Sequence, residues 1–246
     1  MSRIRIQGPE ADLENATLVE GFPGIGLVGK IATDHLIEEL DMRYYASVHC
    51  KGLPQVGVYR KGDRTVRPPV RLYVSEDEDL LALQSDTPIS ADAAETVASC
   101  LTGWLVDEGV RPIYLSGRPA DEDGAHALSG VATGDGGDAL ESIGVELPSE
   151  DGIISGPTGA LLNRAAQLDL DAIGLVVECS PNFPDPEAAS ELIERAIAPL
   201  ADLSIDVERL RERDEEIQHH REEFAQRMQE MGQDESSQAR PLRMYQ

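Results

Sequence analysis

The chain has 246 residues, of which 41% are apolar, so it can bury the core of one large α/β domain with an appendage. Acidic residues outnumber basic residues by 46 to 21, and the formal net charge is −25. A surface of this charge repels phosphate groups, which argues against nucleic acids and anionic membranes as partners.

The basic residues include only three lysines, Lys30, Lys51 and Lys61, and the rest are arginines. An excess of carboxylates with few lysines is typical of adaptation to a salt-rich cytoplasm, where screening weakens self-repulsion. The alternative is an ordinary acidic protein. Because the acidic residues are spread over the whole chain, salt adaptation is the favoured interpretation.

The cysteines Cys50, Cys100 and Cys179 lie far apart in the sequence and form no Cys-x-x-Cys pair. The sequence therefore predicts neither a disulfide framework nor a zinc site, and it favours a reducing compartment. No apolar stretch approaches the ~18 residues that a membrane span requires. We therefore expect a soluble cytoplasmic protein.

The first predicted elements are a buried strand over residues 17–22, a Gly-Pro-Gly turn, and a helix over residues 27–40. Further strands are expected over residues 44–49, 55–59, 70–74, 80–83, 111–116 and 172–178. Further helices are expected over residues 90–108, 160–167 and 186–199. Residues 121–137 are expected to form a surface loop with a short element inside it, and residues 152–159 a second loop. This alternation predicts an α/β fold, a mostly parallel sheet covered by helices on both faces, within a domain over residues 1–203.

Beyond residue 203 an apolar side chain recurs every seventh position, which predicts a long amphipathic helix over residues 204–231. The heptad positions are Leu203, Leu210, Ile217, Phe224 and Met231. Such a helix can pack against the same helix of another subunit or lie on its own domain, and both interpretations remain open.

Gly232 ends that helix, residues 233–240 are polar and are predicted to be disordered, and residues 241–246 include apolar and aromatic side chains. Apolar side chains at the tip of a polar tail (residues 232–246) bury nothing there. We therefore expect them to bind in a pocket of a partner protein.

The glycine loop after the first strand matches two phosphate-binding patterns. Gly24, Gly26 and Gly29 have the spacing of the dinucleotide fingerprint, and Gly24, Gly29 and Lys30 have that of a P-loop. The P-loop lacks the Ser or Thr that binds Mg²⁺, because Ile31 follows Lys30. The dinucleotide site lacks the acidic residue expected about 20 residues on.

The loop can bind an anion at the helix N-terminus, or it can be a tight turn with no ligand, which we favour. No Gly-x-Ser-x-Gly elbow is present, and the adjacent tail histidines lack metal-site spacing. The sequence therefore predicts no catalytic residues, no cofactor and no metal.

Three segments in order along the chain carry a family resemblance. They are residues 21–29 (GFPGIGLVG), residues 156–162 (GPTGALL), and Glu178 followed by residues 182–189 (NFPDPEAA). Together they resemble the archaeal proteasome-assembly-chaperone family over about residues 18–231. The resemblance implies an α/β/α sandwich, homo-oligomers and no established catalytic role.

Members of this family that act on the proteasome end in a hydrophobic-Tyr-any motif, and Met244, Tyr245 and Gln246 fit it. The resemblance implies docking between α-subunits of the proteasome core particle. There the carboxylate of Gln246 would meet a lysine, Tyr245 would fill the cleft, and Met244 would add apolar contact.

The sequence thus predicts a non-catalytic, homo-oligomeric proteasome-interacting protein, which could be an assembly chaperone, an activator or an adaptor. The alternative is an enzyme or binding protein that uses the loop from Gly24 to Lys30 for a nucleotide or another anion.

Overall fold

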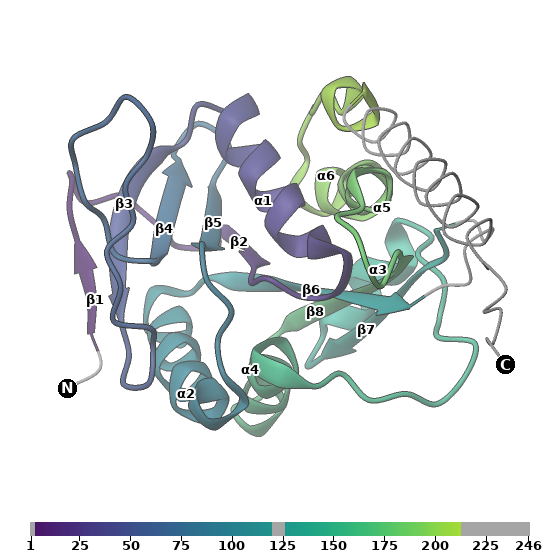
Figure 1. The fold of residues 1–246 in the computed structure, drawn as a ribbon. Coiled ribbons are helices and arrows are strands. Elements are labelled where there is room, and N and C mark those ends of the chain that lie inside the picture. Colours follow the sequence, from purple (N-terminus) through teal and green to yellow (C-terminus); the bar gives the residue numbers. More distant parts are fainter. Residues whose placement is uncertain (1–2, 120–125, 213–246) are drawn as a thin grey trace, which may run out of the picture.

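The computed structural model describes residues 3–119 and 126–212. In this part of the chain eight strands form one sheet in the order β1-β3-β4-β5-β2-β6-β8-β7 (Figure 1). The strands are β1 Arg3–Ile6, β2 Thr17–Gly21, β3 Arg43–His49, β4 Val70–Ser75, β5 Leu80–Ser85, β6 Arg111–Pro119, β7 Leu128–Thr133 and β8 Ala172–Cys179.

The sheet is mixed, which corrects the expectation of a mostly parallel sheet. Strands β5, β2, β6 and β8 run parallel to one another in the centre. Strands β4, β3 and β1 continue the sheet antiparallel on one side, and β7 pairs antiparallel with β8 on the other. The acidic turn between β4 and β5 is short, and a short turn can join only antiparallel neighbours.

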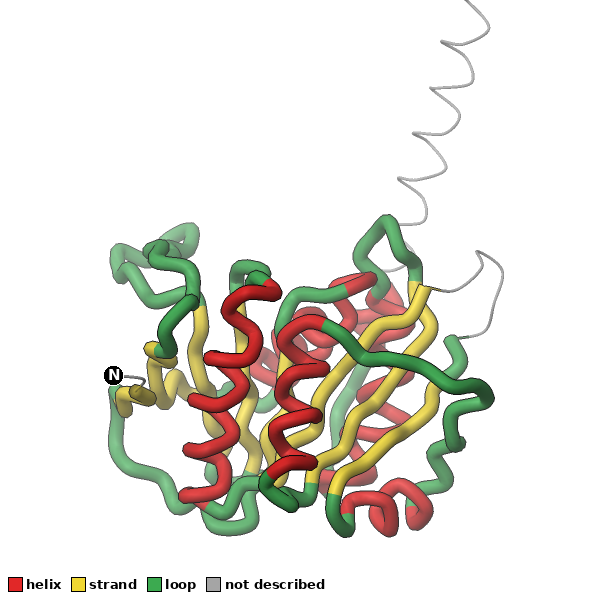
Figure 2. Tube along the Cα trace, turned by 90° about the horizontal axis from the view of Figure 1, so that it is seen from below, coloured by secondary structure: helices red, strands yellow, loops and turns green. Residues whose placement is uncertain are grey.

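Helices cover both faces of the sheet, as predicted (Figures 1 and 2). Helices α2 (Ala91–Glu108) and α4 (Gly156–Gln167) pack side by side on one face. The other face carries α1 (Val28–Glu39) and α5 (Pro186–Leu192), which continues through η2 (Ile193–Ile197) and α6 (Ala198–Ala201). A short α3 (Gly136–Ser142) packs beside β7. The chain therefore folds as an α/β/α sandwich.

Each face of the sheet has its own hydrophobic core. On β2, Leu18 points into the core beneath α2 and α4, and its neighbour Val19 points into the core beneath α1 and α5. This division follows from the two-residue period of a strand, whose successive side chains point to opposite faces. A strand buried on both sides therefore appears in the sequence as a continuous apolar run.

Strand β1 was not expected from the sequence, and β7 lies where a short element of unspecified type was expected, within residues 121–137. Strand β1 pairs only with β3, and β7 pairs only with β8, so neither needs a long apolar run. Helix α3 begins at the end of the expected loop over residues 121–137, continues beyond it, and was not expected. Residues 55–59, expected to be a strand, form only an isolated bridge between Val58 and Arg67.

The expectation that the cysteines form no disulfide was wrong. Cys50, which directly follows β3, forms a disulfide with Cys100 of α2. The two residues lie 50 positions apart, and sequence spacing does not reveal that the helix packs over the end of the strand. Cys179 is free and buried. In the described ranges no helix is long and apolar enough to cross a membrane, and no cluster of metal-binding side chains occurs.

The start of the predicted C-terminal helix also differs. Residues 203–207 are not helical, and a helix begins at Glu208. Val207 and Leu210 are buried in the core beneath α1, Leu203 packs against that core, and His35 Nε2 lies 2.6 Å from the carbonyl oxygen of Asp206. The first two heptad positions therefore pack on their own domain. Ile217, Phe224, Met231 and the tail residues Met244, Tyr245 and Gln246 lie outside the described residues.

Candidate functional site

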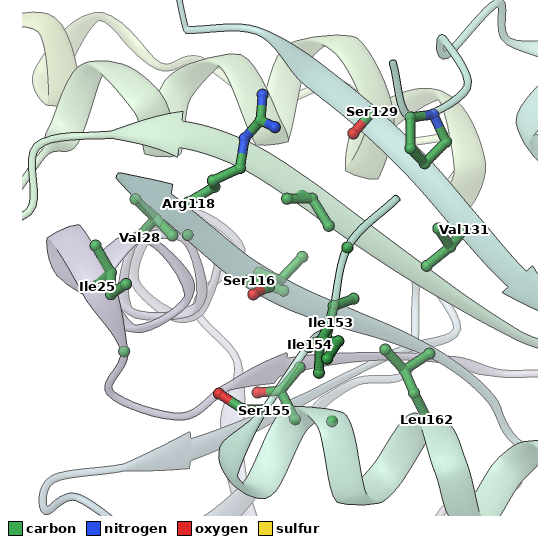
Figure 3. A pocket seen from close by; sticks show the side chains of 18 of the residues that line it. Ile25, Val28, Ser116, Arg118, Ser129, Val131, Ile153, Ile154, Ser155 and Leu162 are labelled. Atoms are coloured by element: carbon green, nitrogen blue, oxygen red, sulfur yellow. The ribbon is translucent and has the colours of Figure 1, made fainter. Parts of the chain in front are cut away.

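A cavity of about 730 Å³ opens at the carboxyl ends of the central parallel strands (Figure 3). Strands β2 and β6 are neighbours there, but the chain leaves β2 toward one edge of the sheet and leaves β6 toward the other. This reversal opens a crevice outside the strand ends, which is where open α/β sheets bind ligands. The cavity therefore lies at the position where this fold favours a binding site.

The first glycine loop forms one wall of the cavity and is shaped by close packing. Its backbone forms a short 3₁₀ turn, η1 (Ile25–Leu27), before α1 begins. Gly26 has φ 62°, and a Cβ built on it would lie 2.8 Å from the sulfur of Cys179. Only glycine adopts this conformation at low cost and leaves room for Cys179. This part of the loop therefore has a structural role.

The structure separates the four loop residues that the sequence grouped. Gly24 and Gly29 line the cavity, whereas Gly26 and Lys30 do not. The ammonium of Lys30 lies 2.6 Å from Asp34 one turn along α1, and 4.0 Å from Asp86. A P-loop lysine must reach the bound phosphate. The expected cation is therefore held elsewhere by carboxylates.

The second glycine loop forms the opposite wall, and its chain crosses in front of the strands before α4 begins (Figure 2). Ile153 and Ile154 line the cavity, and Ser155 precedes the first residue of α4 (Figure 3). A Cβ on Gly159 would lie 2.0 Å from the carbonyl oxygen of Ile154. The loop therefore folds tightly back on the helix and presents its apolar side chains to the cavity.

A buried carboxylate that the sequence analysis missed joins the two loops. Glu20 of β2 is fully buried, and it accepts hydrogen bonds from the backbone N–H of Phe22 at 2.6 Å and the hydroxyl of Thr158 at 3.2 Å. A third donor is the N–H of Leu115 at 3.3 Å. Burial raises the pKa of the Glu20 carboxyl to about 7, although these three hydrogen bonds lower it. Its one sequence signal is an acidic residue inside an otherwise apolar strand.

The third motif segment is fixed to the first loop. Asp185 accepts hydrogen bonds from the N–H groups of Ala188 and Ser180, and so caps α5. Its own N–H donates to the carbonyl oxygen of Gly26 at 2.9 Å. The three sequence segments that carried the family resemblance therefore meet around one end of the sheet.

The charge around the cavity is negative. The guanidinium of Arg118 projects at the cavity (Figure 3), and it is paired with Glu150 at 2.6 Å and with Glu178. Glu146 and Asp151 also line the cavity, and neither has a cationic partner among the described residues. This negative charge disfavours the binding of phosphate and favours the binding of cationic groups. The apolar side chains of the lining favour apolar groups.

The lining also lacks the parts of a nucleophilic active site. Ser116, Ser129 and Ser155 line the cavity, but no histidine or lysine of the described ranges does. A serine nucleophile needs an adjacent base within hydrogen-bond distance. In the described part of the lining, therefore, these serines have no histidine or lysine beside them to act as that base.

The sequence profile of the PAC2 family matches residues 18–225, a span that contains all three motif segments. The chain belongs to the PAC2 family. A relative in Methanocaldococcus jannaschii, described as an uncharacterised protein, is 27% identical over 223 residues, and the match covers 90% of both chains.

Two solved structures from Pyrococcus furiosus are similar to this chain in fold. One is PbaA, described as an archaeal homolog of proteasome-assembly chaperone, with 27% identity, a TM-score of 0.80, and coverage of 96% of this chain and 97% of PbaA. The other is PbaB, described as an archaeal proteasome activator, with 25% identity, a TM-score of 0.76, and coverage of 91% and 98%. The similarity extends over nearly the whole of each chain.

Proposed function

We propose that this protein is a non-catalytic, homo-oligomeric partner of the proteasome core particle. The observation that carries the proposal is the similarity to PbaA and PbaB over more than nine tenths of the chain. One of these proteins is described as a homolog of an assembly chaperone and the other as a proteasome activator. A role in assembling or activating the core particle is therefore the function that the comparisons support best.

We propose that Met244, Tyr245 and Gln246 make the contact with the core particle by inserting between adjacent α-subunits. The Tyr245 ring supplies apolar area and a hydroxyl that can donate a hydrogen bond, and the Met244 side chain adds apolar contact. A single short segment of this kind binds weakly. Several copies held on one oligomer raise the effective concentration, so the avidity can exceed the affinity of one segment by ~10²–10⁴.

The alternative proposal is that a nucleotide or other anion binds at the loop from Gly24 to Lys30. We rank it second because Lys30 is paired with Asp34 and because unpaired carboxylates line the cavity. This alternative predicts a rise in the unfolding temperature on addition of Mg-ATP, since a ligand stabilises the state that binds it. The rise should be lost in Lys30→Ala.

The test is co-sedimentation of the purified protein with the core particle of the same organism, at high salt. We expect the intact chain to bind and the chain without residues 244–246 to lose at least ~90% of the bound fraction, because avidity multiplies the loss of each contact. Tyr245→Ala should behave like the truncation. The control is Gln238→Ala, which also changes one residue of the tail to alanine but lies outside the last three residues. This variant should bind normally.

Two results would contradict the proposal at different levels. Normal binding by the truncated chain would show that the contact lies elsewhere on the molecule. No binding by the intact chain would remove the proteasome as its partner. Where the intact chain does bind, the peptidase activity of the core particle and its assembly from separate subunits distinguish an activator from an assembly chaperone.

A further inference from the structure

The long connection between β3 and β4 is the basic part of an acidic chain. Residues 51–71, here named the basic loop, contain six of the 21 basic residues and only one of the 46 acidic residues. Three of these six are ion-paired within the fold: Arg60, Arg67 and Arg71. The other three are exposed and have no carboxylate partner in the part of the chain that the structure describes: Lys51, Lys61 and Arg64.

Apolar side chains stand beside these free cations. Tyr59 is 79% exposed and Val66 is 65% exposed, and Val56 is exposed as well. Single exposed apolar residues are common on protein surfaces, but three in one loop among unpaired cations form an amphipathic surface. Such a surface matches an acidic partner that offers apolar contact.

The basic loop is held in place at both ends. Cys50, directly before the loop, is joined to α2 by the disulfide, and Leu53 is buried. Val58 and Arg67 exchange two backbone hydrogen bonds of 2.9 Å across the loop. The Arg71 side chain is buried and paired with Asp86 at 2.6 Å. Because these contacts pre-order the loop, binding through it loses little conformational entropy.

The mouth of the cavity has the complementary chemistry. Glu146, Leu147, Glu150, Asp151 and Ile153, here named the acidic mouth, all line the cavity and are all exposed. Ile153 is 94% exposed, so its side chain has almost no contact within its own chain. The mouth thus presents the unpaired carboxylates of Glu146 and Asp151 beside apolar side chains. Its carboxylates complement the free cations of the basic loop, and its apolar side chains can pack against the apolar side chains of that loop.

The two surfaces cannot meet within one copy. The basic loop joins β3 and β4 in one half of the sheet, whereas the acidic mouth lies by β6, β8 and β7 in the other half (Figure 1). We propose that the basic loop of one copy docks in the acidic mouth of the next copy. Contacts of this head-to-tail kind build a closed ring when the rotation between copies closes. This inference deepens the homo-oligomer part of the proposed function.

Charge and apolar area have separate roles in this contact. At about 1 M salt the Debye length is ~3 Å, so only charges in close contact still attract. The burial of Tyr59, Val66 and Ile153 does not weaken with screening, and it supplies the driving force in salt. The charges set the orientation, because like charges brought together by a wrong orientation repel.

The test measures the mass of the full-length protein by sedimentation, without any core particle, so that its outcome does not depend on the tail. We expect the unchanged chain to form oligomers. Lys61→Glu with Arg64→Glu, and separately Glu146→Lys with Asp151→Lys, should each raise the dissociation constant by about tenfold or more, since each brings like charges together. None of the four residues has an ionic partner in the described ranges, so the fold should be kept.

A chain that carries all four reversals restores opposite charges across the contact and should again form oligomers. Val66→Ser tests the apolar part, and Val106→Ser on α2, which is 46% exposed, is its matched control. Only Val66→Ser should weaken the oligomer. Circular dichroism checks that every variant is folded.

The inference is overturned if the unchanged chain is a monomer at every concentration measured, or if neither pair of reversals lowers the mass. It is also overturned if each pair lowers the mass but their combination does not restore it, because the two surfaces then do not face each other. Loss of core-particle binding in a chain that still forms oligomers would concern the tail and leave this contact intact.

Discussion

At the scale of single residues, two glycines of the same loop differ in what the fold requires of them. Gly26 has φ 62°, and a Cβ built on it would lie 2.8 Å from the sulfur of Cys179. Gly24 has an extended backbone, and a Cβ built on it would meet no atom within 4 Å. We expect Gly26→Ala to lower the free energy of unfolding by about 1–3 kcal/mol, because alanine is strained there and a Cβ would crowd the sulfur. Gly24→Ala should change it by less than ~0.5 kcal/mol.

Chemical denaturation of the two variants measures this difference. If the two variants lower the free energy of unfolding equally, the loop is shaped by something other than the close approach of Cys179 to Gly26. If Gly24→Ala alone impairs function while stability is unchanged, a ligand or partner approaches the backbone at Gly24, as in a dinucleotide site.

Glu20 gives a prediction about pH. Its carboxyl has a pKa of about 7 in the fold against an ordinary value of 4.5, so the folded state holds a proton that the unfolded state has released between these values. Its contribution to stability is therefore complete below about pH 4.5 and is lost as the pH rises through 7. A pKa shift of this size corresponds to a change of about 3 kcal/mol in the free energy of unfolding.

The measurement compares the free energy of unfolding of the unchanged chain and of Glu20→Gln from pH 5 to pH 8. Glutamine cannot ionise, so the difference between the two curves isolates the carboxyl from the other acidic residues. We expect the unchanged chain to lose stability relative to the variant as the pH rises. Parallel curves would mean that Glu20 is ionised throughout this range.

At the scale of elements, the disulfide joins the end of β3 to α2 and closes a long stretch of chain. Such a bond removes conformational freedom from the unfolded chain, and more so for a long loop. We expect Cys50→Ser with Cys100→Ser, or reduction of the unchanged chain, to lower the free energy of unfolding by ~2–4 kcal/mol. The double variant should not respond to a reductant, and a response of equal size would refute the assignment.

At the scale of the whole molecule, the net charge of −25 means that the negative side chains repel one another and destabilise the compact folded state. We expect the midpoint of thermal unfolding to rise by at least ~3 °C, corresponding to ~1 kcal/mol, between about 0.1 M and 1 M salt, as the Debye length falls from ~10 to ~3 Å. Two salts of equal ionic strength should act alike if screening is the cause. A midpoint independent of salt would contradict salt adaptation.

The sequence by itself determined the local features, because these depend on neighbours along the chain. The apolar run at residues 17–21 became a strand buried on both faces, and the amphipathic residues 91–108 became the helix α2. The order of strands and helices predicted the α/β class with both faces covered. The three motif segments also led to the family, since each is a contiguous pattern.

Only the tertiary structure decided which distant residues meet. Cys50 and Cys100 form a disulfide, and Leu210 packs on its own domain. Glu20 accepts a hydrogen bond from Thr158, which lies 138 residues further along the chain. Lys30 belongs to a P-loop pattern in the sequence but pairs with Asp34 in the fold. The edge strand β1 escaped prediction because one neighbouring strand holds it without a long apolar run. Local patterns specify elements, whereas contacts across the fold depend on how all the elements pack together.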